Sequence, residues 1–299
     1  MMFLLHAHGG EAGHWAEEIL LEGLIDTLKI IPFLFLTYLL MEFIEHRAGE
    51  KAESFMKKAG RFAPVVGGAL GIAPQCGFSA AAANLYAGRV ISVGTLIAVF
   101  LSTSDEMLPI MISGRVNGGT IAFVLLYKAV AAILSGLAVD LVLRLIRRKD
   151  EPINIDAICD EDNCHCERGI WYSALHHTAT ISLFILLITL ALNAVVFFVG
   201  EETLGTIMYG KPVVSHMIAA VCGLIPNCAV SVALTTLCTE GLITVGTMLS
   251  GLFSGAGVGI LVLFKVNKRA KENAAIVGVI LALSVAFGLI GELIFKTII

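Results

Sequence analysis

Long apolar stretches separated by short polar connections dominate the chain. Eight of them are about 20 residues or longer, the length needed to cross a hydrocarbon core of about 30 Å. They lie at residues 27–45, 62–87, 90–112, 119–143, 171–199, 214–239, 242–264 and 274–298. Because a helix satisfies its own backbone polar groups in lipid, the pattern predicts an all-α polytopic membrane protein.

The apolar pattern repeats at an offset of 152 residues, which takes Cys76 to Cys228. The stretch GIAPQCGFS at 71–79 returns as GLIPNCAVS at 223–231, and VGT at 93–95 returns as VGT at 245–247. Each copy places glycine, proline, an amide and cysteine inside an apolar segment. In a membrane such a break survives only where it is buried in protein or lines a cavity. Paired breaks in equivalent halves indicate the substrate site of a transporter.

The basic residues cluster at 47–61, 144–149 and 265–271, and the positive-inside rule places all three clusters in the cytoplasm. Eight full crossings cannot do this, because three spans would separate the first cluster from the second. If 62–87 and 214–239 are re-entrant hairpins, each half has three crossings plus one hairpin. The prediction is then two inverted repeats of about ten helical segments in all, with both termini external.

Composition agrees with this layout. The 299 residues are 57% hydrophobic and 15% charged, with a mean hydropathy of +0.88, whereas soluble domains carry roughly 25% charged residues. We divide the chain into an external, amphipathic and His-rich segment (1–26), a first transmembrane repeat (27–143), a cytoplasmic acidic and Cys-rich linker (144–170) and a second transmembrane repeat (171–299). The expected location is the inner (plasma) membrane, with the lipid bilayer as a partner.

The two predicted hairpin tips carry most of the candidate substrate-binding residues. Proline and glycine unwind a helix there and free carbonyl and N–H groups, while the amides and cysteines add side-chain ligands. The members are Gly71, Pro74, Gln75, Cys76 and Ser79 in the first half, and Gly223, Pro226, Asn227, Cys228 and Ser231 in the second. The alternative is that proline and cysteine merely kink a buried helix.

A second group of candidates lies in the segment 90–112, where Ser102, Ser104, Asp105 and Glu106 occur within STSDE. An acid inside a membrane costs about 2.5–3.5 kcal/mol on insertion scales and marks a functional site by default. The repeat partner of Asp105 is Gly257, so a site here would be negative on one side only. This suits a cation or a coupled proton. Alternatively, the span ends near Ser102 and the acids are solvated.

The linker contains CDEDNCHCERG, in which Cys159, Cys164, His165 and Cys166 could wrap a soft or borderline metal ion such as Zn²⁺. The alternative is a solvated acidic linker with free thiols in a reducing cytoplasm. No Walker motif, dinucleotide fingerprint or catalytic elbow appears, so we expect no enzyme, no required cofactor and no nucleic-acid partner. A metal ion is expected only as substrate.

The PQC and PNC motifs of the two hairpin tips, together with STSDE, resemble those of the family of ten-span heavy-metal exporters. Members of this family are also described as arsenic efflux proteins or manganese transporters. The resemblance covers residues 26–298 and includes the two-half organisation. It implies efflux of a metal or metalloid ion across the inner membrane, without deciding which ion.

The primary hypothesis is therefore a secondary transporter that exports a metal or metalloid ion between two hairpin tips. Mn²⁺ would favour Asp105, Glu106, hydroxyls and carbonyls, whereas trivalent arsenic would favour the thiolates of Cys76 and Cys228. The runner-up is an anion transporter with opposed hairpins. A third reading, a membrane thiol redox protein or metal sensor, leaves the duplicated hairpins unexplained. The coupling ion, the direction of transport and the oligomeric state, a homodimer included, stay open.

Overall fold

The computed structural model describes residues 62–72, 77–103, 107–146, 170–199, 212–226 and 228–298, together with scattered positions between 20 and 39. These described residues form helices and connections without a strand. Within them, four helical stretches are long and apolar enough to cross a membrane: Val93–Ser113, Gly118–Leu145, Val245–Val266 and Ala270–Phe295. The prediction of an all-α polytopic membrane protein is confirmed.

The helices of the two halves lie at equivalent positions, with ends that agree within one residue except that α11 begins three residues before the equivalent of the start of α3. The first half contains α3 (Ala63–Leu70), α4 (Gly77–Ala87), α5 (Val93–Ser102), α6 (Met107–Ser113) and α7 (Gly118–Leu145). The second contains α11 (Pro212–Gly223), α12 (Cys228–Thr239), α13 (Val245–Ser254), α14 (Val258–Val266) and α15 (Ala270–Ile298), preceded by α9 (Ile170–Val199). A shift of 152 residues takes both ends of α5 onto those of α13, so the duplication extends to helix boundaries.

The same capping chemistry starts the equivalent helices α5 and α13. The Ser92 hydroxyl accepts a hydrogen bond from Thr95 N at 3.1 Å, and the Thr244 hydroxyl accepts one from Thr247 N at 3.1 Å. A hydroxyl at the N-cap position satisfies one of the backbone donors that the first turn leaves without a helical partner. The repeated hydroxyl therefore fixes where both helices begin.

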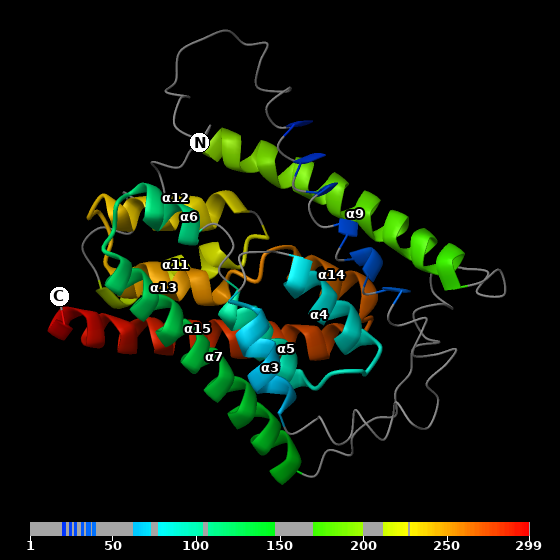
Figure 1. Ribbon diagram of the computed structural model, residues 1–299, viewed down its shortest axis with the longest axis horizontal. Helices are drawn as coiled ribbons and strands as arrows, with labels where there is room; N and C mark the ends of the chain where they lie inside the picture. Colours follow the sequence, from blue (N-terminus) through cyan, green and yellow to red (C-terminus); the bar gives the residue numbers. More distant parts are fainter. Residues whose placement is uncertain are drawn as a thin grey trace, which may run out of the picture.

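The centre of the molecule is the pair α5 and α13, in which every residue after the first is buried. The longer helices α7 and α15 lie outside them and cross one another in the view of Figure 1. They expose large apolar side chains, including Leu126, Leu134 and Leu293. An apolar surface of this kind is stable against lipid and not against water.

Glycine allows α5 and α7 to cross closely. A Cβ atom on Gly94 would lie 2.2 Å from Gly136 O, and one on Gly136 would lie 2.5 Å from Gly94 O. Small residues drive the association of membrane helices because they let the backbones approach. The equivalent α13–α15 crossing is as tight, since a Cβ on Gly288 would meet Ser250 Oγ at 1.7 Å.

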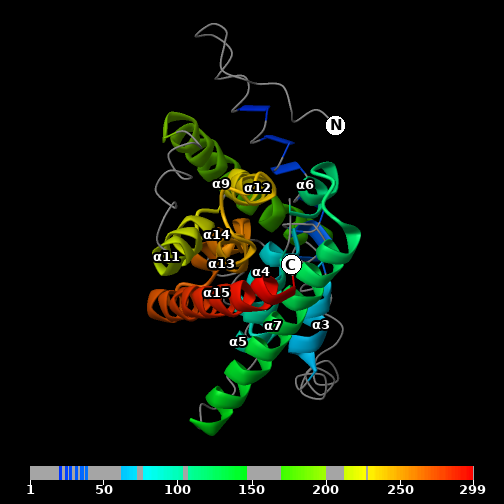
Figure 2. The same ribbon diagram turned by 90° about the vertical axis from the view of Figure 1, so that its left-hand side faces the viewer.

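The two halves interlock through their short helices. The first half's α4 lies beside the second half's α14, and α6 lies beside α12 (Figures 1 and 2). The contact of α4 with α14 is close, because a Cβ on Gly259 would lie 2.7 Å from Ser79 Cβ. The α4–α14 and α6–α12 contacts are equivalent under the 152-residue shift. Each half therefore packs a short helix of its own against a short helix of the other half.

Candidate functional site

Both halves interrupt the helix that sequence alone predicts to be continuous at 90–112 and 242–264. The first interruption separates α5 from α6, and the second separates α13 from α14. In the second half, Gly257 adopts φ 53°, a conformation that residues with a side chain rarely adopt. Both stretches are still long and apolar enough to cross a membrane. The end of α5 at Ser102 agrees with the alternative that the sequence left open, whereas the break at 255–257 was not expected.

Side-chain hydroxyls accompany the end of α5. Ser102 Oγ and Thr103 Oγ1 donate to Val99 O at 3.0 and 2.8 Å, and the Thr103 N–H donates to the same carbonyl at 3.1 Å. Hydroxyls that bond the backbone locally compete with continued helix. The run of hydroxyls in STSDE thus has a structural role at the end of α5 in addition to any role as ligands.

A small cavity of about 20 Å³ lies where the breaks meet. Its walls come from the α11–α12 connection, the α13–α14 break and the end of α5. The described residues lining it are Thr103, Gly223, Ile225, Val230, Ser231, Leu234, Gly251, Leu252, Gly255 and Gly257. It therefore joins the second predicted hairpin tip to a residue of the first half.

The structure brings several predicted site residues together. Gly71 packs against α5, where a Cβ would lie 1.9 Å from Ser102 Oγ, and Gly223 packs against α13, where a Cβ would lie 2.1 Å from Gly251 O. Ser79 and Ser102 are fully buried. Ser231 lines the cavity, while Pro226 is half-buried in the connection before α12.

The other predicted site residues lie outside the described part of the chain. These are Pro74, Gln75, Cys76, Ser104, Asp105, Glu106, Asn227 and the linker residues Cys159, Cys164, His165 and Cys166. Cys228 begins α12, but its side chain is not described. Among the residues that the structure describes, no group of three or more His, Cys, Asp or Glu is placed to hold a metal ion.

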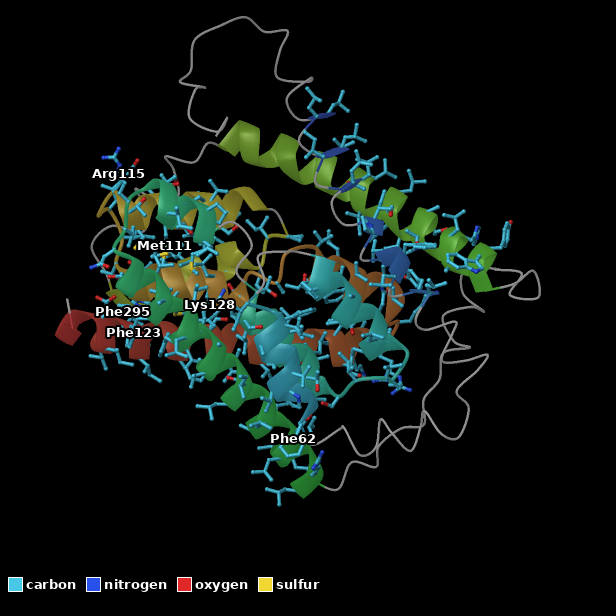
Figure 3. All side chains as sticks on the ribbon, viewed as in Figure 1. Phe62, Met111, Arg115, Phe123, Lys128 and Phe295 are labelled. Carbon is cyan, nitrogen blue, oxygen red and sulfur yellow. The ribbon has the colours of Figure 1, made fainter. Side chains whose placement is uncertain are left out.

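Lys128 on α7 is a site residue that sequence reasoning missed. Its side chain is fully buried and its Nζ donates to Thr103 O and, at 3.0 Å, to Leu252 O. Both acceptors belong to residues that line the cavity. Nζ also lies 5.8 Å from the centroid of the Phe253 ring, within reach of a cation–π attraction. Figure 3 marks Lys128 in the interior of the bundle and Arg115 at its edge.

The sequence did contain a signal for Lys128, because it is the one Lys or Arg in the apolar segment 119–143. An ionisable residue inside a membrane span indicates a functional site by default. The acid in the same segment, Asp140, has a different role. Its carboxylate accepts from Ser92 Oγ at 2.7 Å and from Gly94 N at 2.9 Å, which holds the start of α5. The surface ion pair that the spacing to Arg144 suggests is therefore not the main contact of Asp140.

Comparison with known proteins adds one match. A family model described as "Putative, 10TM heavy-metal exporter" matches residues 16–197. No curated protein and no solved structure matches the chain.

Proposed function

The chain belongs to the family of ten-span heavy-metal exporters, and we propose that it exports a hard divalent cation of the manganese class through the cavity at the helix breaks. As a member of this family with membrane-crossing helices, it is a multi-pass membrane protein. The ion, the site and the path are our proposal.

The observation that carries the proposal is that backbone carbonyls from both halves already hold a positive charge beside the cavity. Thr103 O at the end of α5 and Leu252 O in the last turn of α13 both accept from the Lys128 ammonium. The C-terminal end of a helix carries partial negative charge and favours cations. Freed carbonyls of broken membrane helices are the groups that coordinate cations in transporters.

The chemistry of the cavity wall supports a hard cation over a soft one. The described lining offers the hydroxyls of Thr103 and Ser231 and backbone carbonyls, and none of these lining residues carries sulfur. Oxygen ligands suit Mn²⁺, whereas thiolates select soft ions. Trivalent arsenic would need the thiolates of Cys76 and Cys228 as ligands. Substitution of these two cysteines therefore distinguishes transport of arsenic from transport of Mn²⁺.

The size of the cavity favours a single ion over the anion alternative. Its volume is about 20 Å³, and one water molecule needs roughly 10–15 Å³ on this scale. A dehydrated metal ion with one water would fit, whereas an organic anion would not. The Lys128 ammonium, which is bonded to two residues of the cavity lining, would attract a small anion, so a small anion belongs in the transport test.

We extend the proposal to an inverted pair of repeats with re-entrant hairpins. Gly67 lies against Thr95 and Val99 while Gly71 lies against Ser102, so α3 runs in the direction of α5. The α4–α14 and α6–α12 pairings are equivalent to each other under the 152-residue shift, which supports a two-fold relation between the halves such as inverted repeats have. With the basic clusters inside, both termini are external. Reporter fusions at the two ends test this, and opposite locations would contradict it.

Transport by purified protein in proteoliposomes tests the cargo. Vesicles loaded with Mn²⁺, Zn²⁺, Cd²⁺, arsenite or phosphate are compared with protein-free vesicles, and Mn²⁺ efflux is expected to exceed the background. The variant C76S/C228S is expected to keep Mn²⁺ efflux, as is the control C222S/C238S, whose half-buried cysteines are absent from the cavity lining.

The competing results are distinct. Arsenite efflux without Mn²⁺ efflux, lost in C76S/C228S and kept in C222S/C238S, would replace the hard-ion site by thiolate ligation. Efflux of phosphate alone would favour the anion transporter. Absence of any flux from folded protein would contradict the transporter proposal itself.

A further inference from the structure

We infer that Arg89, Tyr86 and Glu272 form a gate on the cytoplasmic side of the cavity, which we call the latch. The latch is closed in this structure and has to open in each transport cycle. This inference rests on the proposed function and adds the step that separates the cavity from the cytoplasm. It also distinguishes two ends of the molecule that the repeat alone makes equivalent.

The latch joins the two halves of the chain through one carboxylate. Arg89 follows α4, and its guanidinium donates to both oxygens of Glu272 in the first turn of α15, at 2.7 and 3.3 Å. The hydroxyl of Tyr86 on α4 donates to the same carboxylate, and the guanidinium carbon lies 5.1 Å from the centroid of the Tyr86 ring. A bidentate arginine–carboxylate pair is stronger and more directional than an ordinary hydrogen bond. The two charged side chains are only 15% and 19% exposed, so water screens them weakly.

Each side of the latch is fixed to one helix. The backbone N–H of Arg89 donates to Tyr86 O at 2.9 Å, so the turn that carries the guanidinium moves with α4. Across the α14–α15 connection, Nδ2 of Asn267 donates to Oδ1 of Asn273 at 2.7 Å, and Nδ2 of Asn273 donates to Asn267 O at 2.6 Å. These bonds hold the first turn of α15, and with it Glu272, to the end of α14. The latch therefore ties α4 of the first half to α14 of the second.

The helices that the latch ties together lie side by side from the helix breaks onward (Figure 1). Helix α14 begins directly after Gly257, which lines the cavity. In its first turn Gly259 packs against Ser79 in the first turn of α4. The latch lies at the other end of both helices. Separation of α4 from α14 would open a path from that end to the cavity, and the closed latch opposes this separation.

The backbone of Arg89 is strained where its repeat partner is not. Arg89 has φ 59°, a left-handed conformation that is uncommon for residues other than glycine. The equivalent residue of the second half is Gly241, with φ 75°, a conformation that glycine adopts without steric cost. The turn thus needs a left-handed residue in both halves, and only the first half places a charged side chain on it. The contacts of the guanidinium with Tyr86 and Glu272 offset the strain.

The pseudo-symmetric end of the molecule, where α6 and α12 lie side by side, has no equivalent of the latch. The positions that correspond to the three latch residues hold Cys238, Gly241 and Thr120. None of these is Asp, Glu, Lys or Arg, and a Cβ on Gly241 would meet no atom within 4 Å. Ionic contacts at one end only favour the conformation in which that end is closed.

The latch lies at the end that we place in the cytoplasm. The connection from α14 to α15 belongs to the basic cluster 265–271, and the positive-inside rule keeps such a cluster inside the cell. Arg269 of this cluster also pairs with Glu272, at 3.6 Å. An exporter has to expose its cavity to the cytoplasm to load an ion and then close that side before release. The latch opens for the first step and closes for the second.

The test measures how fast a reporter cysteine in the cavity reacts from each side of the membrane. The reporter is Thr103→Cys, and a membrane-impermeant maleimide is added to right-side-out or inside-out vesicles. Mass spectrometry reads the labelling at position 103, so the native cysteines stay in place. Arg89→Gly removes the guanidinium and also the backbone strain. Arg115→Gly is the matched control, because Arg115 follows α6 at the opposite end, has φ 56° and is exposed.

Arg89→Gly is expected to speed labelling from the cytoplasmic side about fivefold, the effect of removing a well-formed ion pair, without speeding it from outside. Arg115→Gly should label as the reporter chain does. Glu272→Gln should match Arg89→Gly, and the double variant should add nothing, because either change already breaks the pair. This cycle isolates the contact between the two residues from their other contacts. Unchanged cytoplasmic labelling in Arg89→Gly, or an equal rise on both sides or in Arg115→Gly, would overturn the latch.

Tyr86→Phe covers the case in which Arg89→Gly fails to fold. It keeps the ring and removes only the hydroxyl that donates to Glu272, so a smaller rise from the cytoplasmic side is expected, and no rise would overturn the latch. Labelling needs no cargo, which separates this test from that of the proposed function. A one-sided rise in a protein that moves no ion keeps the latch and removes the exporter. Mn²⁺ efflux together with labelling that Arg89→Gly does not change removes the latch and keeps the exporter.

Discussion

The two halves have equivalent helices but differ at the positions that would handle an ion. Lys128 in the first half corresponds to Ile280 in the second, and Asp105 corresponds to Gly257. The turn before α5 carries Arg89, which binds Glu272 at 2.7 Å, whereas the equivalent residue before α13 is Gly241. Duplication thus supplied a two-fold scaffold, and charge was placed on one side of it.

The arms of the two predicted hairpins also differ. In the first half α3, α4 and α5 line an open apolar cavity of about 340 Å³. In the second half the Leu234 side chain fills the corresponding space, since its Cδ1 would lie 2.2 Å from a Cβ on Gly251. The residues equivalent to Leu234 and Gly251 are Ala82 and Val99, both of which line the large cavity. The bulky residue of this pair is Val99 on α5 in the first half and Leu234 on α12 in the second, so the two hairpins pack differently against their central helices.

The largest expected effect comes from removing the acid that only the first half carries. Asp105→Asn is expected to lower metal efflux more than about tenfold, because losing a charged ligand from a low-dielectric site costs more than about 1.4 kcal/mol. The amount of folded protein in the membrane should not change. Efflux is measured in proteoliposomes, with Asp160→Asn in the linker as the control. Normal transport by both Asp105→Asn and Glu106→Gln would indicate solvated acids and remove the functional asymmetry.

The second effect concerns the break in the other half. Gly257 has φ 53°, so Gly257→Ala is expected to cost about 1–3 kcal/mol of backbone strain and to reduce transport several-fold. Gly278→Ala on α15 is the control, since a Cβ there would meet no atom within 4 Å and Gly278 does not line the cavity. Thermal unfolding and efflux are measured for both. Equal behaviour of the two variants would show that the break does not depend on the conformation of Gly257.

A smaller effect is expected from the helix-start acids. Asp140→Ala removes the acceptor for Ser92 Oγ and Gly94 N and is expected to cost about 2 kcal/mol, since a buried donor loses its partner. Its repeat partner Glu292 makes no comparable hydrogen bond among the described residues, so Glu292→Ala should cost less. Thermal shifts of the purified variants give the comparison. A larger loss of thermal stability in Glu292→Ala would show that Glu292, and not Asp140, is the more important acid at the start of its neighbouring central helix.

The smallest effect uses the cavity between the first hairpin's arms. Ala82→Leu is expected to stabilise the protein by about 1 kcal/mol, because it fills apolar space as Leu234 does in the second half. Ala83→Leu is the control. Ala83 is fully buried and does not line the cavity, so a leucine there should overpack the core and destabilise the protein. Melting temperatures decide between them. If both variants lower the melting temperature, the cavity has no room for a leucine side chain in the folded protein.

The sequence by itself determined the membrane class, the duplication and the positions of the first pair of breaks. These follow from local properties: apolar length sets a span, and proline with glycine interrupts a helix wherever the chain runs. The sequence also marked Ser102, Gly71 and Gly223, which the structure places in close contact with the central helices. The 152-residue offset also predicted the equivalence of α5 and α13.

Only the tertiary structure decided which groups meet. The break at 255–257 was missed because the apolar run 242–264 has no proline, and Gly257 reveals its role only through its backbone angle. Lys128 was missed because its meaning depends on Thr103 and Leu252, which are 25 and 124 residues away. The spacing of apolar residues along the sequence predicts local helix formation. A binding site, in contrast, forms from groups that are distant in sequence and are brought together by tertiary packing.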